Sequence, residues 1–258
     1  MEEIIRAKIV AEKAARDAGK YILERMGRLK EVSHKSGRSD LVTDVDRNSE
    51  KMIMERIKKE FPSHSILAEE SGGATSEDAV SWIIDPLDGT TNYTHCFPFF
   101  CVSIGIFFKG AVKAGIVYDP SRDEMFSAEE GKGAFLNGKN IRVSAQDMVG
   151  DSLIATGFAP GTFGKRENLE YFRRMIEIAQ AVRRAGSAAL DLCYVACGRF
   201  EGFWELGLNP WDTAAGQLLV EEAGGTVTTI SGEPFDLFKK EILATNGRIH
   251  DEMLRLMK

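Results

Sequence analysis

The spacing of apolar residues changes twice along the chain, and this change restricts the fold more than any other feature. Residues 4–22 and 45–57 carry apolar side chains at three- and four-residue spacing, which predicts two amphipathic helices. Residues 100–129 contain three β-rich runs, and Asn137-Gly138 beyond them is typical of a hairpin turn. After about residue 150, predicted strands and helices alternate. The sequence therefore predicts a mixed α/β (α+β) protein.

The order of these elements predicts two lobes. We expect an N-terminal lobe over residues 1–145, with helices and an antiparallel meander, and a C-terminal α/β lobe over residues 146–258. No linker rich in Pro or Ser separates them, so the lobes are expected to share a core and to enclose a cleft. Residues 29–44 show no periodicity and are expected to form a loop.

Composition excludes several classes of protein. The chain has 258 residues, with 33 Lys and Arg against 39 Asp and Glu, so its formal charge is −6. This acid excess argues against direct nucleic-acid binding, but not against a phosphorylated substrate, because metal ions can supply positive charge. No stretch reaches the ~18 apolar residues of a membrane span, and no export signal is visible. We therefore expect a cytoplasmic protein whose four cysteines are reduced.

Two carboxylates follow one apolar strand. The strand at 81–84 runs directly into Asp85, and Asp88 lies three residues further on. Pro86 has no N–H group and is expected to end the strand, while Gly89 permits a tight turn before a possible helix start. This arrangement indicates a site for magnesium and phosphate. Asp-Pro and Asp-Gly are also ordinary turn sequences, so this segment alone does not decide between the two readings.

The same segment bears on the mechanism. Phosphatases with an aspartyl nucleophile carry Asp-x-Asp-Gly-Thr after a strand. Here Pro86 occupies the position two residues before Asp88, so that motif is broken. The sequence therefore favours water activated by metal over a covalent phospho-enzyme.

Three further acids stand at element boundaries. Glu69 follows an apolar strand, and Asp44 and Asp212 each stand at the beginning of a predicted helix. Asp44 could equally be a helix N-cap, and Asp212 could be a favourable charge in a first turn.

Together these segments resemble the inositol monophosphatase family of magnesium-dependent, lithium-sensitive phosphatases. The resemblance covers nearly the whole chain and implies a layered α/β/α/β/α sandwich, commonly a homodimer, with the active site in the cleft between the lobes. The matching segments are Glu69-Glu70-Ser71, Asp85-Pro86-Leu87-Asp88-Gly89-Thr90-Thr91-Asn92, Gly186-Ser187-Ala188-Ala189, Trp211-Asp212 and Glu222-Ala223-Gly224-Gly225.

The resemblance implies two to three Mg²⁺ ions in each active site. Glu69, Asp85 and the Leu87 carbonyl would hold the first ion. Asp85, Asp88 and Asp212 would hold the second. Glu69 would also face a weaker third ion, near a mobile loop that carries Lys35.

The resemblance also implies roles around the substrate. Thr90 and Asp44 would orient and deprotonate the attacking water, and the N–H groups of Gly89 and Thr90 would contact the phosphate. On the leaving-group side, the residues expected to meet hydroxyl groups are Asp88, Ala188 and Glu205.

We therefore expect hydrolysis of a phosphate monoester, with myo-inositol 1-phosphate as the first choice, since an acid at position 205 suits a neutral polyol. The alternative is a dual-activity fructose-1,6-bisphosphatase/inositol monophosphatase, with Arg166, Arg173 or Arg183 taking the second phosphate. A regulatory partner of the transcription machinery is the less favoured reading, because nothing in the sequence marks such an interface.

Overall fold

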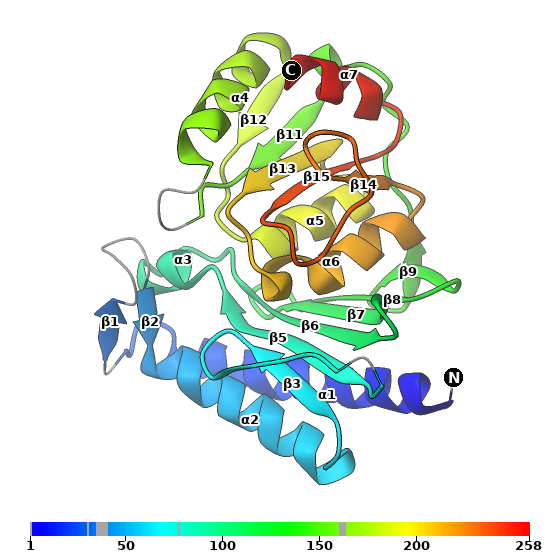
Figure 1. The fold of residues 1–258 in the computed structure, drawn as a ribbon. Helices are drawn as coiled ribbons and strands as arrows, with labels where there is room; N and C mark the ends of the chain where they lie inside the picture. The colour runs from blue at the N-terminus through cyan, green and yellow to red at the C-terminus, as the bar shows by residue number, and fades with distance from the viewer. Residues whose placement is uncertain (1, 30, 35–40, 77, 160–163) are drawn as a thin grey trace.

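The computed structural model describes residues 2–29, 31–34, 41–76, 78–159 and 164–258. Two sheets and three helix layers are stacked on one another (Figure 1). The first helix layer covers the outer face of the larger sheet, the second lies between the two sheets, and the third covers the outer face of the smaller sheet. These layers are formed by α1 (Glu2–Arg25) and α2 (Asp44–Glu60), by α5 (Ala188–Ala196) and α6 (Pro210–Glu222), and by α4 (Lys165–Ile178) and α7 (His250–Leu256). The predicted α/β/α/β/α sandwich is confirmed.

The larger sheet has eight strands in the order β10-β9-β8-β7-β6-β5-β3-β4. Neighbouring strands are antiparallel except β3 and β5, which run parallel, so the predicted meander is confirmed. Its strands are β3 (Ser65–Ala68), β4 (Gly72–Gly73), β5 (Ser81–Asp88), β6 (Cys101–Phe108), β7 (Ala111–Asp119), β8 (Glu124–Glu129), β9 (Gly133–Leu136) and β10 (Lys139–Ile141).

The smaller sheet has five strands in the order β12-β11-β13-β15-β14. Strand β11 runs parallel to both of its neighbours, while β15 is antiparallel to β13 and β14. These strands are β11 (Leu153–Thr156), β12 (Ala181–Arg183), β13 (Gly202–Leu206), β14 (Thr226–Thr228) and β15 (Glu241–Thr245). A 3₁₀ turn, η1 (Val149–Asp151), leads into β11.

The segment predicted as a loop over 29–44 contains a small hairpin. Strands β1 (Val32–His34) and β2 (Leu41–Thr43) pair antiparallel, so the loop prediction is wrong for these residues. Strands of three residues offer too few positions for alternation to show in the sequence.

Helix α6 packs closely on the larger sheet. A Cβ atom added at Gly105 would lie 2.8 Å from the Cβ of Ala214, and one at Gly115 would lie 2.7 Å from the carbonyl oxygen of Ala215. One buried apolar cluster joins Ile83 and Phe126 of the larger sheet to helices α5 and α6 and the smaller sheet beyond. The expected shared core is therefore present, whereas the division at residue 145 stays a prediction.

Two further observations concern the cysteines and the helices of the described chain. Cys96, Cys101, Cys193 and Cys197 are all free thiols. No helix in the described part of the chain is long and apolar enough to span a bilayer.

Candidate active site

A cavity of about 410 Å³ lies where the ends of both sheets meet the helices between them. In the described part of the chain, its wall includes residues at the end of β3, at the end of β5 and the start of α3 (Thr90–Thr94), at the start of α5, on strand β13 and at the start of α6. Nine residues predicted for the site line it: Glu69, Asp85, Leu87, Asp88, Gly89, Thr90, Ala188, Glu205 and Asp212. Lys35 lies outside the described residues.

Strand β5 delivers the central acids differently from the sequence prediction. It continues past Pro86 to Asp88, which pairs with Cys101 on β6, so the predicted end at the proline is wrong. The register shifts between Asp85 and Asp88, and such a bulge accommodates a residue without an N–H group. The Asp85 carboxylate accepts a hydrogen bond from the Leu87 N–H group at 3.0 Å and thereby braces the bulge.

Gly89 forms the turn that leads from β5 into α3. Its φ of 94° lies in the left-handed region, and a Cβ atom there would come 2.8 Å from the carbonyl oxygen of Phe99. Both observations require glycine at this position. The close approach brings the first N–H groups of α3 to the cavity wall beside Asp88.

Asp88 is held by a helix that follows the other sheet's first strands. Its carboxylate oxygen Oδ2 accepts hydrogen bonds from the Ser187 hydroxyl at 2.6 Å and from the Ala189 N–H group at 2.8 Å. Ser187 is also the N-cap of α5, where its side chain accepts from the Leu190 N–H group. One hydroxyl therefore orders both the start of α5 and the carboxylate of Asp88, a role that the Gly186–Ala189 motif alone did not reveal.

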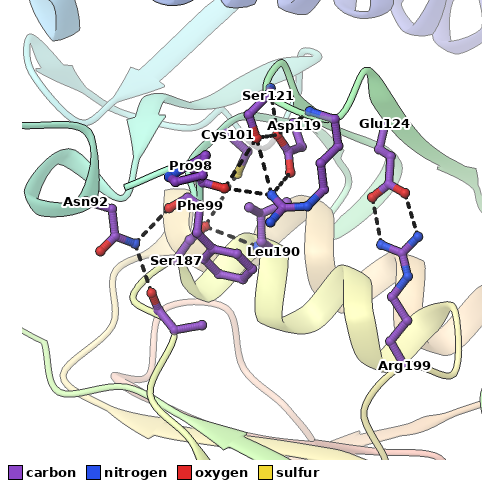
Figure 2. A network of polar contacts seen from close by, with 12 residues as sticks. Asn92, Pro98, Phe99, Cys101, Asp119, Ser121, Glu124, Ser187, Leu190 and Arg199 are labelled. Atoms are coloured by element: carbon purple, nitrogen blue, oxygen red, sulfur yellow. Dashed lines mark hydrogen bonds and ion pairs between the residues drawn. The ribbon is translucent and has the colours of Figure 1, made fainter. Parts of the chain in front are cut away.

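The start of α5 is fixed from the α3 side as well. The side-chain amide of Asn92 donates to the carbonyl oxygen of Phe99 at 2.7 Å and to that of Ala185 at 2.9 Å. Figure 2 shows the side chain of Asn92 directed at the backbone of Phe99, with Ser187 and Cys101 nearby. The segment before α5 is therefore tied to the turn that carries Asp88 and Gly89.

The acids at the cavity repel one another. Burial raises the pKa of Asp85 well above its usual value, and the charges of Glu69, Asp88 and Asp212 raise it further. Burial also raises the pKa of Asp88, to about 6, against the opposing effect of the Ser187 and Ala189 donors. Burial and the nearby Asp88 and Glu69 raise the pKa of Asp212. Cations would relieve this repulsion, so the donor set fits a site for hard metal ions.

These acids do not yet form a closed coordination sphere. Within the described ranges, no three His, Cys, Asp or Glu side chains converge on a common point as metal ligands do. The Leu87 carbonyl, predicted as a further ligand, accepts a hydrogen bond from the Thr90 hydroxyl at 3.1 Å. The cavity thus brings oxygen donors together along its wall without grouping three acidic side chains at one point.

The predicted partner of Thr90 is wrong. The Thr90 hydroxyl donates to Asp46 Oδ1 at 2.9 Å, whereas Asp44 faces Arg25, with 3.4 Å between Oδ2 and Nη2. Thr43 is the N-cap of α2, and Asp46 closes a capping box with it. Residues 44 and 46 are two positions apart on a helix and therefore face different sides. The Thr-x-x-Asp spacing of that capping box was the signal that could have found Asp46.

The arginines also differ from the prediction. The described wall of the cavity includes Arg184 but not Arg166, Arg173 or Arg183. Arg173 instead pairs with Glu170 and Glu177 along the exposed side of α4.

A cavity lined by buried carboxylates between the sheets of a five-layered sandwich fits an enzyme that acts on phosphate esters with the help of metal ions. The chain belongs to the inositol monophosphatase family, whose sequence model matches residues 5–258. It is therefore an enzyme, a phosphatase of this family. Members of the family are generally metal-dependent.

Similar proteins carry two kinds of name. The chain is 46% identical to an inositol-1-monophosphatase of Synechocystis, over 95% of this chain and 86% of that protein, and 42% identical to the Nus factor SuhB of Pseudomonas aeruginosa, over 95% and 93%. Among solved structures, the suhB protein of Bartonella henselae superposes with a TM-score of 0.93 at 42% identity, covering 98% of each chain. An inositol monophosphatase of Anabaena superposes with a TM-score of 0.88 at 43% identity, covering 99% and 96%.

Proposed function

We propose that this phosphatase hydrolyses myo-inositol 1-phosphate with the help of two to three Mg²⁺ ions. The observation that carries the proposal is that buried acids from β5 and α6 line one cavity and raise one another's pKa, beside the N–H groups at the start of α3. A phosphate dianion enters such a cavity only when cations are bound there.

The residues that would hold Mg²⁺ are Glu69, Asp85, the Leu87 carbonyl, Asp88 and Asp212. Bound Mg²⁺ would neutralise the charge of the phosphate and activate water for attack. The N–H groups of Gly89 and Thr90 would bind phosphate oxygens and orient the ester for in-line displacement.

Thr90 and Asp46 would orient the attacking water and take up its proton. The Thr90 hydroxyl has one proton, which points to Asp46 or to the Leu87 carbonyl, so the oxygen remains free to accept a hydrogen bond from water. Asp46 is buried, and burial raises its pKa. It is therefore suited to take a proton through Thr90 as the nucleophile forms.

Glu205 would meet the hydroxyl groups of the leaving alcohol together with Ala188 and Asp88. Burial and, to a smaller extent, the nearby charge of Asp88 raise the pKa of Glu205 to about 8. At neutral pH the carboxyl group is then mainly protonated and can both donate to and accept from a polyol. Its ability to repel a second phosphate is correspondingly weaker than its sequence suggests.

Two observations support the dual-activity alternative, a phosphatase that also takes fructose 1,6-bisphosphate. Glu205 is mainly neutral at pH 7, and Arg184 lines the same cavity. A guanidinium group is well suited to bind a second phosphate.

A phosphate-release panel with Mg²⁺ tests both functions. We expect the highest kcat/KM with myo-inositol 1-phosphate, a lower value with fructose 1,6-bisphosphate and little release from adenosine 3′,5′-bisphosphate. A ratio strongly in favour of the bisphosphate would replace our first choice by the alternative. Added Li⁺ should inhibit at submillimolar to millimolar concentration, as the resemblance implies, and full activity at high Li⁺ would contradict that sensitivity.

The relatives named Nus factor SuhB suggest a role beside catalysis. We propose no direct nucleic-acid partner, because the chain carries an acid excess of six charges. A pull-down with RNA polymerase and its elongation factors tests a protein-mediated role. Retention of the polymerase by the wild type and by Asp88→Asn alike would establish a role independent of turnover.

A further inference from the structure

Glu205 lies in a narrow slot between strand β13 and the backbone of Gly157, a residue without a side chain. Its carboxylate is 5% exposed and lines the cavity from strand β13. Gly157 follows the end of β11, and a Cβ atom added there would overlap both carboxylate oxygens of Glu205. The space between the Gly157 backbone and the Glu205 carboxylate is too small for a methyl group. A shift of this backbone would therefore change the position of the carboxylate.

One side chain joins the two walls of this slot. The Asn168 amide nitrogen donates to the carbonyl oxygen of Gly157 at 2.6 Å. Its amide oxygen accepts from the indole N–H group of Trp204, also at 2.6 Å. Trp204 directly precedes Glu205 on β13, and its own carbonyl oxygen accepts from the Thr156 hydroxyl at 2.8 Å. Asn168 thus spans the backbone opposite the acid and the residue next to it.

The surroundings of Asn168 do not otherwise call for a polar residue. It is 1% exposed and, with Met175, is one of two residues buried on the described helix α4. Met175 and Trp204 belong to the same apolar cluster, so an aliphatic side chain would fill this place at lower desolvation cost. A buried amide is tolerated there because both of its ends are paired, and such paired groups fix geometry more than they add stability.

We propose that Asn168 is a positioning residue, which sets the location of the Glu205 carboxylate by tying the Gly157 backbone to the Trp204 indole. This inference rests on the proposed contact between Glu205 and the hydroxyl groups of the leaving alcohol. Helix α4, which lines no part of the described cavity wall, thereby determines selectivity for a polyol.

The test uses the full-length enzyme with Mg²⁺ and two substrates, myo-inositol 1-phosphate and p-nitrophenyl phosphate, whose leaving group has no further hydroxyl. Asn168→Asp removes the donor to Gly157, and Trp204→Phe removes the donor to Asn168 without adding charge. Each should lower the ratio of kcat/KM for the two substrates about five- to tenfold, as expected for one lost hydrogen bond. The loss should appear as a higher KM for inositol 1-phosphate.

The matched control is Asn140→Asp on β10, where the amide donates to the Ala134 carbonyl at 3.3 Å, away from the cavity. It makes the same chemical change and should leave the ratio as in the wild type. In a Glu205→Gln background, Asn168→Asp should cause no further fall in the ratio, because both changes act on one contact.

Three results would overturn the inference. The first is an unchanged ratio of kcat/KM in either Trp204→Phe or Asn168→Asp, and one of the two variants is enough. Circular dichroism and thermal melting establish that the variant is folded. The second is an undiminished effect of Asn168→Asp in the Glu205→Gln background. If Glu205→Gln itself leaves the ratio unchanged, the proposed leaving-group contact fails together with this inference. If only Glu205→Gln lowers the ratio, that contact stands and the role of Asn168 alone is refuted.

Discussion

Asp88 is the residue on which most of the site converges. It follows the bulge in β5, lies beside Asp85 and accepts hydrogen bonds from Ser187 and Ala189 of the α5 region. Under the proposed function Asp88 would bind both the cations and the substrate, and its hydrogen bonds also join β5 to the start of α5. Turnover and stability are therefore measured separately when Asp88 is replaced.

We expect Asp88→Asn to lower kcat by about 1000-fold or more, because the amide cannot replace a charged metal ligand. The amide oxygen can still accept from Ser187, and one source of repulsion is removed, so the melting temperature in EDTA should equal or exceed that of the wild type. Phosphate release and differential scanning fluorimetry measure the two effects. The exposed Asp147→Asn serves as a control, and near-wild-type turnover of folded Asp88→Asn would refute the assignment.

Asp44 and Asp46 form a matched pair for a second test. Asp46→Asn should reduce kcat by about 100-fold, since the amide can still accept a hydrogen bond from Thr90 but cannot take up a proton as a base. Asp44→Asn should change kcat little, because this acid faces Arg25 rather than Thr90. Steady-state kinetics on both variants decides the assignment, and the reverse order of effects would restore Asp44 as the functional acid.

At the scale of single elements, helix α7 carries a buried histidine. His250 is 6% exposed, and its ring nitrogens hydrogen-bond the hydroxyl groups of Thr228 and Thr245. Burial lowers the pKa of His250 below its usual value. The neutral ring therefore belongs to the folded state, and the unfolded chain binds the extra proton first as pH falls.

It follows that His250 contributes to loss of stability as pH falls below about 6.5, the unfolded-state value. In urea unfolding with Mg²⁺ present, the wild type should lose more stability between pH 7 and pH 5 than His250→Gln does. The exposed His95→Gln provides the control. Equal losses of stability in the wild type and in His250→Gln would show that protonation of this ring does not contribute to the pH dependence of stability.

Elements with strong local signals could be predicted from the sequence. Helix α1 buries Ala7, Ala11, Ala14 and Ala18 on one face, and the hairpin at Asn137-Gly138 has both residues at positive φ. Features that depend on partners distant in sequence could not. Strand β5 passes Pro86 because β6 pairs beyond the bulge, and Asn168 acquires its role only from Gly157 and Trp204.

The candidate site shows the same division. The acids were predictable because they lie close to the ends of elements: Glu69 follows β3, Asp85 and Asp88 lie in the last half of β5, and Asp212 lies in the first turn of α6. The pairing of Thr90 was not, since it depends on which side of α2 each acid faces. The choice between residues two apart requires knowledge of where the helix begins, and that is set by the Thr43 cap.

At the scale of the whole molecule, the acids between the layers make stability depend on metal. In the metal-free protein the raised pKa values of Asp85, Asp88 and Asp212 mean that the folded state binds more protons than the unfolded chain. Stability in EDTA should therefore fall as pH rises from about 4 through 6. Saturating Mg²⁺ should remove this loss.

Unfolding in urea with EDTA or with Mg²⁺, at several pH values, measures this difference. Mg²⁺ at 100 times its dissociation constant should add about 2.7 kcal/mol near pH 7.5, and less near pH 5, where protons compete. A metal effect independent of pH would refute the electrostatic account.

The homodimer implied by the family resemblance stays a prediction, which light scattering checks against the 28.5 kDa of one chain.

The hold of α5 on Asp88 has a consequence for the synthesis of the enzyme. Asp88, Ser187 and Asp212 line one cavity although they lie far apart in the sequence, and Asp46 is linked to the wall of this cavity by the Thr90 hydroxyl. A nascent chain that extends only to the end of the larger sheet contains Asp88 but not Ser187 and Ala189, which donate hydrogen bonds to its carboxylate. We therefore expect partial chains to be inactive, and turnover to begin only after the segment that contains Asp212 has been synthesised and has packed against the larger sheet.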